Sequence, residues 1–380
     1  MFQITLVGPT GVGKTSVLAA MYNELEYELN QIGCEFKPIG TTKRNIIERR
    51  SELEGLGKGQ KSILTENVAI MGTAGSRQFD FELRIPVKRD GKQDLLTFPV
   101  RITDLPGAWY QGSDRGTEAD KILTDSNCSF WVVDSTALME NISDEKETGE
   151  FHNIINDPET IYNSYQRAFQ DKHEDHTIVM VLVRSESYVQ KISKLYQKSM
   201  SWFEFCCRRC LPFLQKDCTK ELKDRTKESK DRTKELYDKL NLGYARLLWK
   251  LYGQTNGISA FACHVETVGN LFFQDFELNQ GKPQARFRRG TKSYTPKNGG
   301  LPLRITIKQI LEKEKIKTHQ TVTEKDTLSR WLYDVFIGRS DVNTPKEDLK
   351  AIETVLFYIT NKLQKDKYVA FNPEKGGFVW

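Results

Sequence analysis

The sequence predicts an α/β fold with three layers, in which a central sheet lies between helices on its two faces. Two observations carry this prediction. Short, largely apolar runs recur at residues 2–7, 128–134, 177–183 and 258–263, and they have the length and composition of buried strands. A glycine-rich loop follows the first run and leads into a helical pattern, and a strand followed by a helix is the unit of α/β folds.

The glycine-rich loop is the most specific part of the chain. Residues 8–16 are Gly-Pro-Thr-Gly-Val-Gly-Lys-Thr-Ser and match the phosphate-loop pattern G-x-x-x-x-G-K-[ST] in full. Glycines let such a loop wrap a phosphate chain with its backbone N–H groups pointing at the oxygens. Lys14 is the expected catalytic contact to the β and γ phosphates, and the Thr15 hydroxyl is an expected Mg²⁺ ligand. The residues expected to bind the nucleotide here are Gly8, Gly11, Val12, Gly13, Lys14, Thr15 and Ser16.

The flanks of the loop supply the context that the motif needs. Residues 2–7 are the expected strand before it, and residues 16–25 are the expected helix after it. The apolar face of that helix contains Val17, Ala20, Met21 and Leu25. Its N-terminus adds partial positive charge to the phosphate site. Together these features predict a P-loop NTPase fold.

The acidic motif after the loop indicates the class of P-loop protein. Asp104 ends an apolar run and forms D-x-x-G with Gly107. In GTPases this aspartate holds Mg²⁺ through water, and the glycine N–H contacts the γ-phosphate. A hairpin of residues 79–87 and 95–104 leads into the motif, which is the layout of Ras-like GTPases. The alternative is an ATPase in which Asp134, at the end of the next strand, is the metal-binding acid.

The strand at residues 177–183 is followed by the place where GTPases recognise guanine, usually through N/T-K-x-D. Here residues 183–186 are Val-Arg-Ser-Glu, so Arg184 replaces the lysine and Glu186 replaces the aspartate. A carboxylate is retained, and we expect both residues to contact the nucleotide. The alternative is that Ser185 caps a helix with an ordinary acidic first turn. A T-x-G sequence at residues 267–269 follows the last predicted strand.

Two further site residues are predicted less directly. Residues 26–72 are polar and glycine-punctuated and should contain the first switch, whose threonine binds Mg²⁺. Thr73, just before the hairpin, is the preferred candidate and would join Thr15 and Asp104 as a metal ligand. The other candidates are Thr41, Thr42 and Thr65. Many GTPases orient the attacking water with a glutamine directly after D-x-x-G, but the nearest glutamine here is Gln111, so slow hydrolysis is expected.

The motifs together resemble a known family. The sequence GPTGVGKTSVLAAMYNEL at residues 8–25, with D-L-P-G, R-S-E and T-x-G after it, resembles divergent TRAFAC, Ras-like GTPases. In particular it resembles the double-GTPase-type proteins of bacterial conflict and defence operons. The resemblance covers about residues 1–315 and implies a Mg²⁺-dependent protein that binds GTP and GDP and switches a partner or effector protein. The alternatives are the ATPase above and a pseudo-GTPase that only assembles with other proteins.

The chain is expected to form a GTPase-like domain at residues 1–315, with a helical insertion at 187–252 and a small helical extension at 316–380. Within the insertion, residues 219–239 repeat a heptad three times and place acids four residues before bases. This pattern predicts a solvated, projecting helix, and a partner-docking arm is the alternative. Residues 144–175 are also expected to be helical.

The C-terminal third contains two other features. Residues 284–297 are basic and aromatic, and we expect a flexible loop; the alternative is phosphate contact by Arg286, Arg288 and Arg289. Two helical patterns at 316–345 and 346–364 precede a tail that ends in Phe378, Val379 and Trp380. This aromatic end would dock either on a partner or on the domain itself.

Composition limits the function classes. The chain of 380 residues is 28% charged, which predicts a strongly polar surface, and its net charge of +5 is too mild to indicate nucleic acid as a partner. No apolar run approaches the roughly 18 residues of a transmembrane helix, and the first strand leaves no room for a signal peptide. We therefore expect a cytoplasmic protein, either monomeric or a homo- or hetero-oligomer.

The seven cysteines are an odd, scattered set, which predicts reduced thiols. Four of them lie close together in the chain: Cys206, Cys207, Cys210 and Cys218. Cys207 and Cys210 have the spacing of half a zinc site, but a second half-site is missing. The aromatic residues and leucines around them instead predict packed core.

Overall fold

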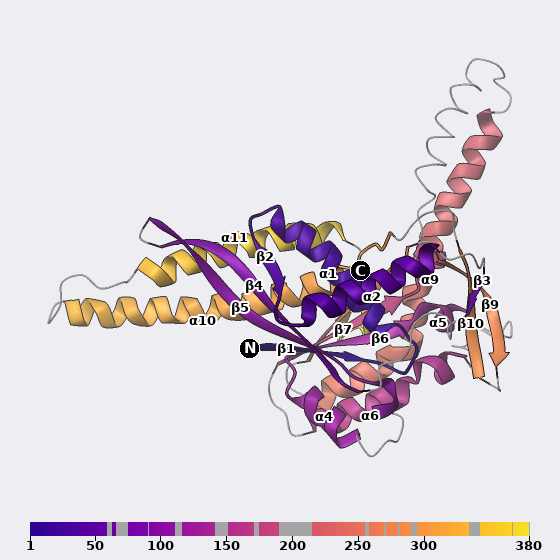
Figure 1. The fold of residues 1–380 in the computed structure, drawn as a ribbon, viewed down its shortest axis with the longest axis horizontal. Helices are drawn as coiled ribbons and strands as arrows, with labels where there is room; N and C mark the ends of the chain where they lie inside the picture. Colours follow the sequence, from indigo (N-terminus) through magenta and orange to yellow (C-terminus); the bar gives the residue numbers. More distant parts are fainter. Residues whose placement is uncertain are drawn as a thin grey trace.

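The computed structural model shows an α/β protein built around a mixed, mostly parallel sheet with helices on both faces (Figure 1). This arrangement confirms that the fold is α/β and is compatible with the three layers that were predicted. The structure describes residues 1–58, 63–65, 75–89, 91–110, 116–140, 151–170, 175–189, 215–254, 258–269, 271–279, 282–289, 295–333, 343–366 and 368–379.

In the described part of the chain the central sheet has nine strands. In spatial order they are β12 (Gly377–Val379), β11 (Tyr368–Asn372), β8 (Ile258–Val265), β7 (His176–Val183), β6 (Cys128–Asp134), β1 (Phe2–Val7), β5 (Lys92–Asp104), β4 (Arg77–Arg89) and β2 (Glu35–Pro38). The five strands from β8 to β5 run parallel to one another, and the others are antiparallel to their neighbours. β1 therefore lies directly between the two strands that end in Asp134 and Asp104.

Each face of the sheet has its own hydrophobic core because successive strand residues point to opposite sides. In β6, Phe130 and Val132 join one core, whereas Trp131 and Val133 join the other. The first core is covered by α1 (Lys14–Asn30), α2 (Thr42–Lys58), α10 (Leu301–Tyr333) and α11 (Asn343–Lys365). The second is covered by α4 (Gly116–Thr124), α5 (Ser135–Met139), α6 (Pro158–Phe169) and α9 (Gln215–Gln254). The four predicted strands and the predicted helix after the glycine loop are confirmed.

The predicted hairpin is also confirmed, as β4 and β5 pair over their whole length from Arg77–Asp104 to Arg89–Lys92. The segment before it is more regular than predicted. Residues 26–58 contain the end of α1, the edge strand β2 and the 17-residue helix α2. β2 adds to the sheet because its Phe36 is buried and stacks on Phe81 of β4, with ring centroids 4.6 Å apart.

The predicted helical insertion at 187–252 contains α7 (Glu186–Val189) and ends in α9, whose second half packs on the sheet. Leu236, Tyr237, Leu240 and Tyr244 are buried there, so this half is the crossover helix between β7 and β8 and not an insertion. Toward its N-terminus α9 extends away from the sheet, in pink in Figure 1, as the projecting helix was predicted to do. Cys206, Cys207, Cys210 and the side chain of Cys218 lie outside the described residues.

The C-terminal extension is not the separate helical unit that we predicted. α10 continues without a break through residue 315, and α11 packs back on α10 and β4. β11 and β12 then extend the central sheet at the edge formed by β8. Phe378 is buried in the second core, so the tail docks on the domain itself, while Trp380 lies outside the described residues.

Two other predictions change in the structure. Residues 284–289 of the basic segment are not a loop: they belong to β10 (Lys282–Arg289), which pairs with β9 (Leu271–Asn279) and with β3 (Ile63–Thr65) in a second sheet. Arg286 forms an ion pair with Asp275 across that hairpin. A helix was expected at 144–175, and its described residues 151–170 form a π-helical turn, η2 (His152–Asn156), followed by α6, with Asp157 between them at a left-handed φ of 42°.

Among the described residues, no helix is both long and apolar enough to cross a membrane, and no group of three or more His, Cys, Asp or Glu side chains is placed to bind a metal.

Candidate nucleotide-binding site

The 8–15 loop connects the end of β1 to the first turn of α1. Gly11 and Gly13 have φ values of 86° and 100°, which favour glycine because other residues clash in this region. A Cβ atom on Gly8 would lie 2.9 Å from the carbonyl oxygen of Val132, so the loop also packs closely on β6. The sequence therefore places glycine where the backbone geometry of this loop requires it.

Lys14 opens α1 and is folded into the curve of the loop. Its Nζ donates to the carbonyl oxygens of Gly8 and Pro9, both at 2.7 Å, and the side chain is buried. Burial lowers the pKa of Lys14 to about 8, and the nearby charge of Asp104 opposes this shift. An ammonium has three donors, so one N–H remains beyond these two carbonyl contacts.

Thr15 and Asp104 meet beside this lysine. The Thr15 hydroxyl donates to Asp104 Oδ2 at 2.6 Å, and Asp104 is fully buried. Their contact follows from the pairing of β1 with β5, which puts Leu6 opposite Asp104. A hydroxyl and a carboxylate side by side are oxygen ligands of the kind that Mg²⁺ prefers. Two of the three predicted metal ligands are thus brought together.

Gly107 begins the short helix η1 (Gly107–Trp109) directly against the loop. A Cβ atom on Gly107 would lie 2.0 Å from the backbone nitrogen of Thr10 and 2.3 Å from the carbonyl carbon of Pro9. Any side chain would therefore separate D-x-x-G from the loop. Ala108 is exposed beside this contact, whereas Trp109 is buried and fixes the turn in the core.

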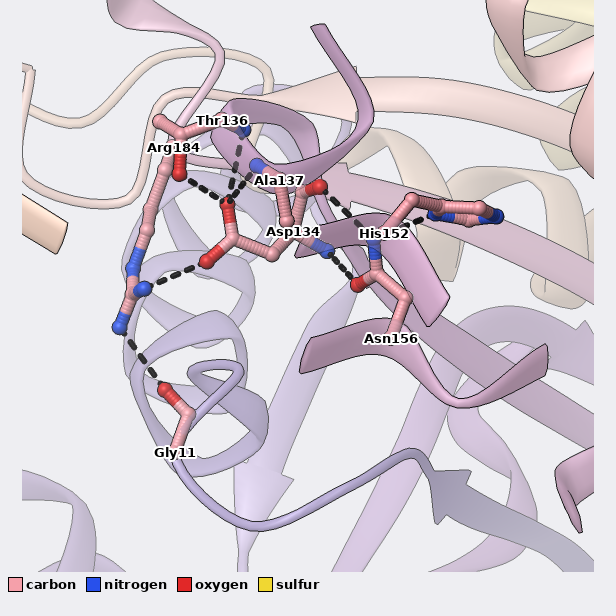
Figure 2. Close-up of polar contacts among 7 residues, drawn as sticks. All are labelled: Gly11, Asp134, Thr136, Ala137, His152, Asn156 and Arg184. Carbon is pink, nitrogen blue, oxygen red and sulfur yellow. Dashed lines mark hydrogen bonds and ion pairs between the residues drawn. The ribbon is translucent and has the colours of Figure 1, made fainter. Parts of the chain in front are cut away.

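Arg184 contacts the loop at Gly11 (Figure 2). Its Nη2 donates to the Gly11 carbonyl oxygen at 2.8 Å, and its Nη1 donates to Asp134 Oδ2 at 2.5 Å. The guanidinium carbon also lies 5.3 Å from the centre of the Phe287 ring, close enough for a cation–π contact. The structure thus places Arg184 on the 8–15 loop, and its contact with a nucleotide stays a prediction.

Asp134 is engaged by protein groups at both oxygens. Its Oδ1 accepts from the Thr136 N–H at 2.8 Å and the Thr136 hydroxyl at 2.6 Å, so it caps α5, while Oδ2 accepts from Arg184. Asn156 holds the backbone behind it, accepting from the Asp134 N–H at 2.7 Å and donating to its carbonyl at 3.1 Å. Sequence reasoning missed Asn156, and no spacing in the chain points to it.

Glu186 faces a different group from the one predicted. It is buried, and its Oε1 accepts from the N–H groups of Val268 and Gly269, both at 3.2 Å, in the T-x-G loop. Burial raises the pKa of Glu186 to about 7, while these two hydrogen bonds oppose the rise. The neighbouring Ser185 precedes α7, but its hydroxyl has no hydrogen-bond partner in the described structure, so it does not cap that helix.

The remaining candidates fall into two groups. Val12 is buried and Ser16 half-buried in the same loop and helix start. Thr73 and Gln111 lie outside the described residues. Of the other threonines, Thr42 is buried and its hydroxyl accepts from the Asp80 N–H at 2.9 Å, which ties the start of α2 to β4.

Searches with the whole sequence against models of protein families and against curated proteins give no match. The interpretation of this site therefore depends on its geometry.

Proposed function

We propose that the protein binds GTP with Mg²⁺, hydrolyses it slowly, and acts as a switch for a partner protein. The observation that carries the proposal is the contact of Thr15 with Asp104 at the start of α1, 2.6 Å apart, beside a glycine loop that Gly107 touches. Sequence motifs that lie almost a hundred residues apart thus meet around one loop. A chance match to the phosphate-loop pattern would not require this convergence.

The residues present fit a nucleotide and its metal ion. The backbone N–H groups of the 8–15 loop, the N-terminus of α1 and Lys14 would hold the phosphates. Thr15 and Asp104 would hold Mg²⁺, which would supply positive charge to neutralise the phosphates. To receive phosphates, Lys14 would exchange its contacts with the loop carbonyls for phosphate oxygens, and its lowered pKa makes a strong anionic partner favourable.

The geometry favours the GTPase over the ATPase alternative. Asp104, not Asp134, contacts the Thr15 hydroxyl, and Asp134 already accepts hydrogen bonds at both oxygens from the cap of α5 and Arg184. Arg184, in the position of the basic residue of the guanine-recognition motif, donates to the Gly11 carbonyl oxygen and so lies beside the proposed site. The recognition of guanine by Glu186 remains a prediction, since its Oε1 is bound to the T-x-G loop.

Slow turnover and a partner are proposed together. The position directly after Gly107 is Ala108, which cannot orient a water, and an arginine supplied from outside is worth about 10³ to 10⁵ in rate. We expect the protein alone to hydrolyse GTP at about 10⁻⁴ to 10⁻² per second. The resemblance to conflict-system GTPases makes a defence effector in the bacterial cytoplasm the proposed partner. Turnover of several per second by the protein alone would contradict this part.

The test of the function is nucleotide binding by the full chain, measured with fluorescent GTP and GDP and by competition with ATP. Lys14→Ala should abolish detectable binding, and Thr15→Ala should remove its dependence on Mg²⁺. Lys37→Ala, which removes an exposed lysine of β2, is the matched control and should bind as the wild type does. Unchanged Mg²⁺-stimulated binding by both loop variants would overturn the proposal. Preference for ATP would favour the ATPase, and binding without turnover the pseudo-GTPase.

A further inference from the structure

The contact between Arg184 and Asp134 connects two parts of the molecule that the nucleotide motifs do not explain. Arg184 follows β7, Asp134 ends β6, and Gly11 is at the exposed turn of the 8–15 loop. The Arg184 guanidinium lies between Asp134 and Gly11 and donates a hydrogen bond to each (Figure 2). A residue that joins the loop to the sheet in this way is placed to control the shape of the loop.

Arg184 is suited to this position in a way that lysine is not. A guanidinium presents its N–H donors in a rigid, planar fork and can bond two acceptors on different elements at once. The backbone of Arg184 has a φ of 56°, which is unusual for a residue with a side chain and directs the stem toward the loop. The face of Phe287 on β10 then limits where the guanidinium can move.

Asp134 supplies a fixed anchor for that fork. Its side chain is 0% exposed, against 18% for Arg184, so the anchor lies in the core and the fork at its edge. Oδ1 is held by the first turn of α5, and the backbone is held on both sides by Asn156. Oδ2 therefore cannot shift without disturbing the core. An ion pair backed in this way keeps a geometry that an exposed pair does not.

The turn that this pair holds has little other support. Gly11 is exposed, and a Cβ atom on it would meet nothing within 4 Å, so no packed side chain fixes the loop there. Its φ of 86° is one of many that glycine can adopt. We propose that Asp134 is a positioning residue for the phosphate-binding loop: it holds Arg184 on the Gly11 carbonyl and so maintains the loop in the conformation that receives a nucleoside diphosphate or triphosphate.

This inference deepens the proposed function and rests on it, but one of its tests does not require nucleotide. Asp134→Asn is the key variant, because asparagine caps a helix as well as aspartate does, while the charge and the oxygen that accepts from Arg184 are lost. Arg184→Ala, Arg184→Lys and the double variant Asp134→Asn/Arg184→Ala complete the set. Three quantities are measured on the full chain: thermal stability, the dissociation rate of fluorescent GDP, and hydrogen exchange of the loop amides without nucleotide.

We expect Asp134→Asn to lower thermal stability, because a largely buried guanidinium loses its anion, and also to speed GDP dissociation about tenfold and exchange of the loop amides. Arg184→Lys should give an intermediate effect, because one ammonium cannot reproduce the fork. The double variant should be no worse than Arg184→Ala alone, since both changes break the same connection. Asp120→Asn is the matched control: it weakens an ion pair with Arg167 between α4 and α6, and it should move neither loop measurement.

The inference is overturned if the two single changes multiply in the double variant, or if Asp134→Asn lowers stability while loop exchange stays at the wild-type rate. In the second case the Asp134 carboxylate stabilises the fold but does not position the loop. A wild-type protein that binds no nucleotide would instead overturn the proposed function. Loop exchange would then still decide whether Asp134 positions the loop.

Discussion

Asp104 and Asp134 make an instructive comparison, because each ends an apolar strand that lies directly beside β1. Asp104 accepts a hydrogen bond from the Thr15 hydroxyl, and the backbone of Gly107 packs against the loop beside it. Asp134 has a guanidinium and a helix cap. Both are fully buried, and only their partners differ. The chemistry of a buried carboxylate is thus set by the donors that the fold brings to it.

The different partners of Asp104 and Asp134 give the two sides of the 8–15 loop different capacities to bind a metal ion. On the Asp104 side, a metal ion could take the place of the hydrogen bond between the Thr15 hydroxyl and Asp104 at little cost, because both oxygens are suitable ligands. On the Asp134 side, a metal ion would have to displace Arg184 and leave a guanidinium without its anion, which is costly for a largely buried pair. Under the proposed function, the Asp104 side would bind the metal ion and the Asp134 side would hold the loop.

The largest predicted difference is in Mg²⁺ dependence. Asp104→Asn should reduce Mg²⁺-dependent affinity for GTP about 100-fold, in line with the loss of a carboxylate that holds a metal through water. Asp134→Asn should leave the ratio of affinities with and without Mg²⁺ unchanged, even if nucleotide dissociates faster. Titrations with GTP in Mg²⁺ and in EDTA measure both ratios. If Asp134→Asn is the variant that loses the Mg²⁺ effect, the roles of the two acids are reversed.

The close backbone contact at Gly107 predicts the next effect. Gly107→Ala puts a methyl group into the space of Thr10 and Pro9, so it should destabilise the protein by about 1–3 kcal/mol and weaken nucleotide binding. Chemical denaturation and GDP titration measure the two quantities. Gly116→Ala is the control: its Cβ would lie 3.6 Å from the nearest atom, Trp109 O, an ordinary contact, so little change is expected. Equal stability of the two variants would show that the loop does not rest on Gly107.

The sequence predicted one side of this comparison much better than the other. The 8–15 loop, Asp104 and Gly107 obey local patterns, and pairing of β1 with β5 brings them together as the motif requires. The bridge from Asp134 to Arg184 depends on the register of β6 against β7, where Asp134 lies opposite Val183, and on a left-handed φ at a non-glycine residue. No single-chain pattern contains either fact.

The same reason explains the errors in the fold. β11 and β12 are short, and they become strands because the edge of β8, about a hundred residues earlier in the chain, offers unpaired backbone groups. The sequence predicts helices only to residue 364 and no strand in the tail after it, because the partner strand is distant in the chain. Likewise, the basic residues of β10 suggested a loop until pairing with β9 placed Arg286 opposite Asp275.

Glu186, two residues after Arg184, should give a smaller effect, a pH dependence of the free energy of unfolding. Since its folded-state pKa is raised from 4.5 to about 7, the folded state binds more protons than the unfolded state between these values. Stability contributed by this group should therefore be complete below about pH 4.5 and should be lost as pH rises through about 7. Glu186→Gln keeps an acceptor for Val268 and Gly269 but cannot titrate. Unfolding measured from pH 5 to pH 8 should show a flatter profile for this variant, and parallel profiles would contradict the assignment.

The smallest predicted effect tests whether residues deeper in the core help to hold Asp134 in place. His152 is buried and accepts at Nδ1 from Asn156, whose amide also holds Asp134. A Cβ atom on Gly243 of α9 would lie 2.8 Å from His152 Nε2, which has no hydrogen-bond partner among the described residues. Burial lowers the pKa of His152 to about 4, so a neutral ring packs against this glycine.

Gly243→Ala therefore gains helix propensity of about 0.5–1 kcal/mol but loses about 1–3 kcal/mol to overpacking, for a net loss of about 1 kcal/mol. Gly253→Ala is the control on the same helix, since nothing lies within 4 Å of its Cβ position, and it should be neutral or stabilising. Denaturation of both variants gives the difference, and GDP dissociation shows whether the displaced ring reaches Asp134 through Asn156. A slight loss of stability with faster GDP release would make α9, the helix that extends from the domain, part of the support of the loop. The same loss with an unchanged release rate would confine that support to Asp134, Asn156 and Arg184.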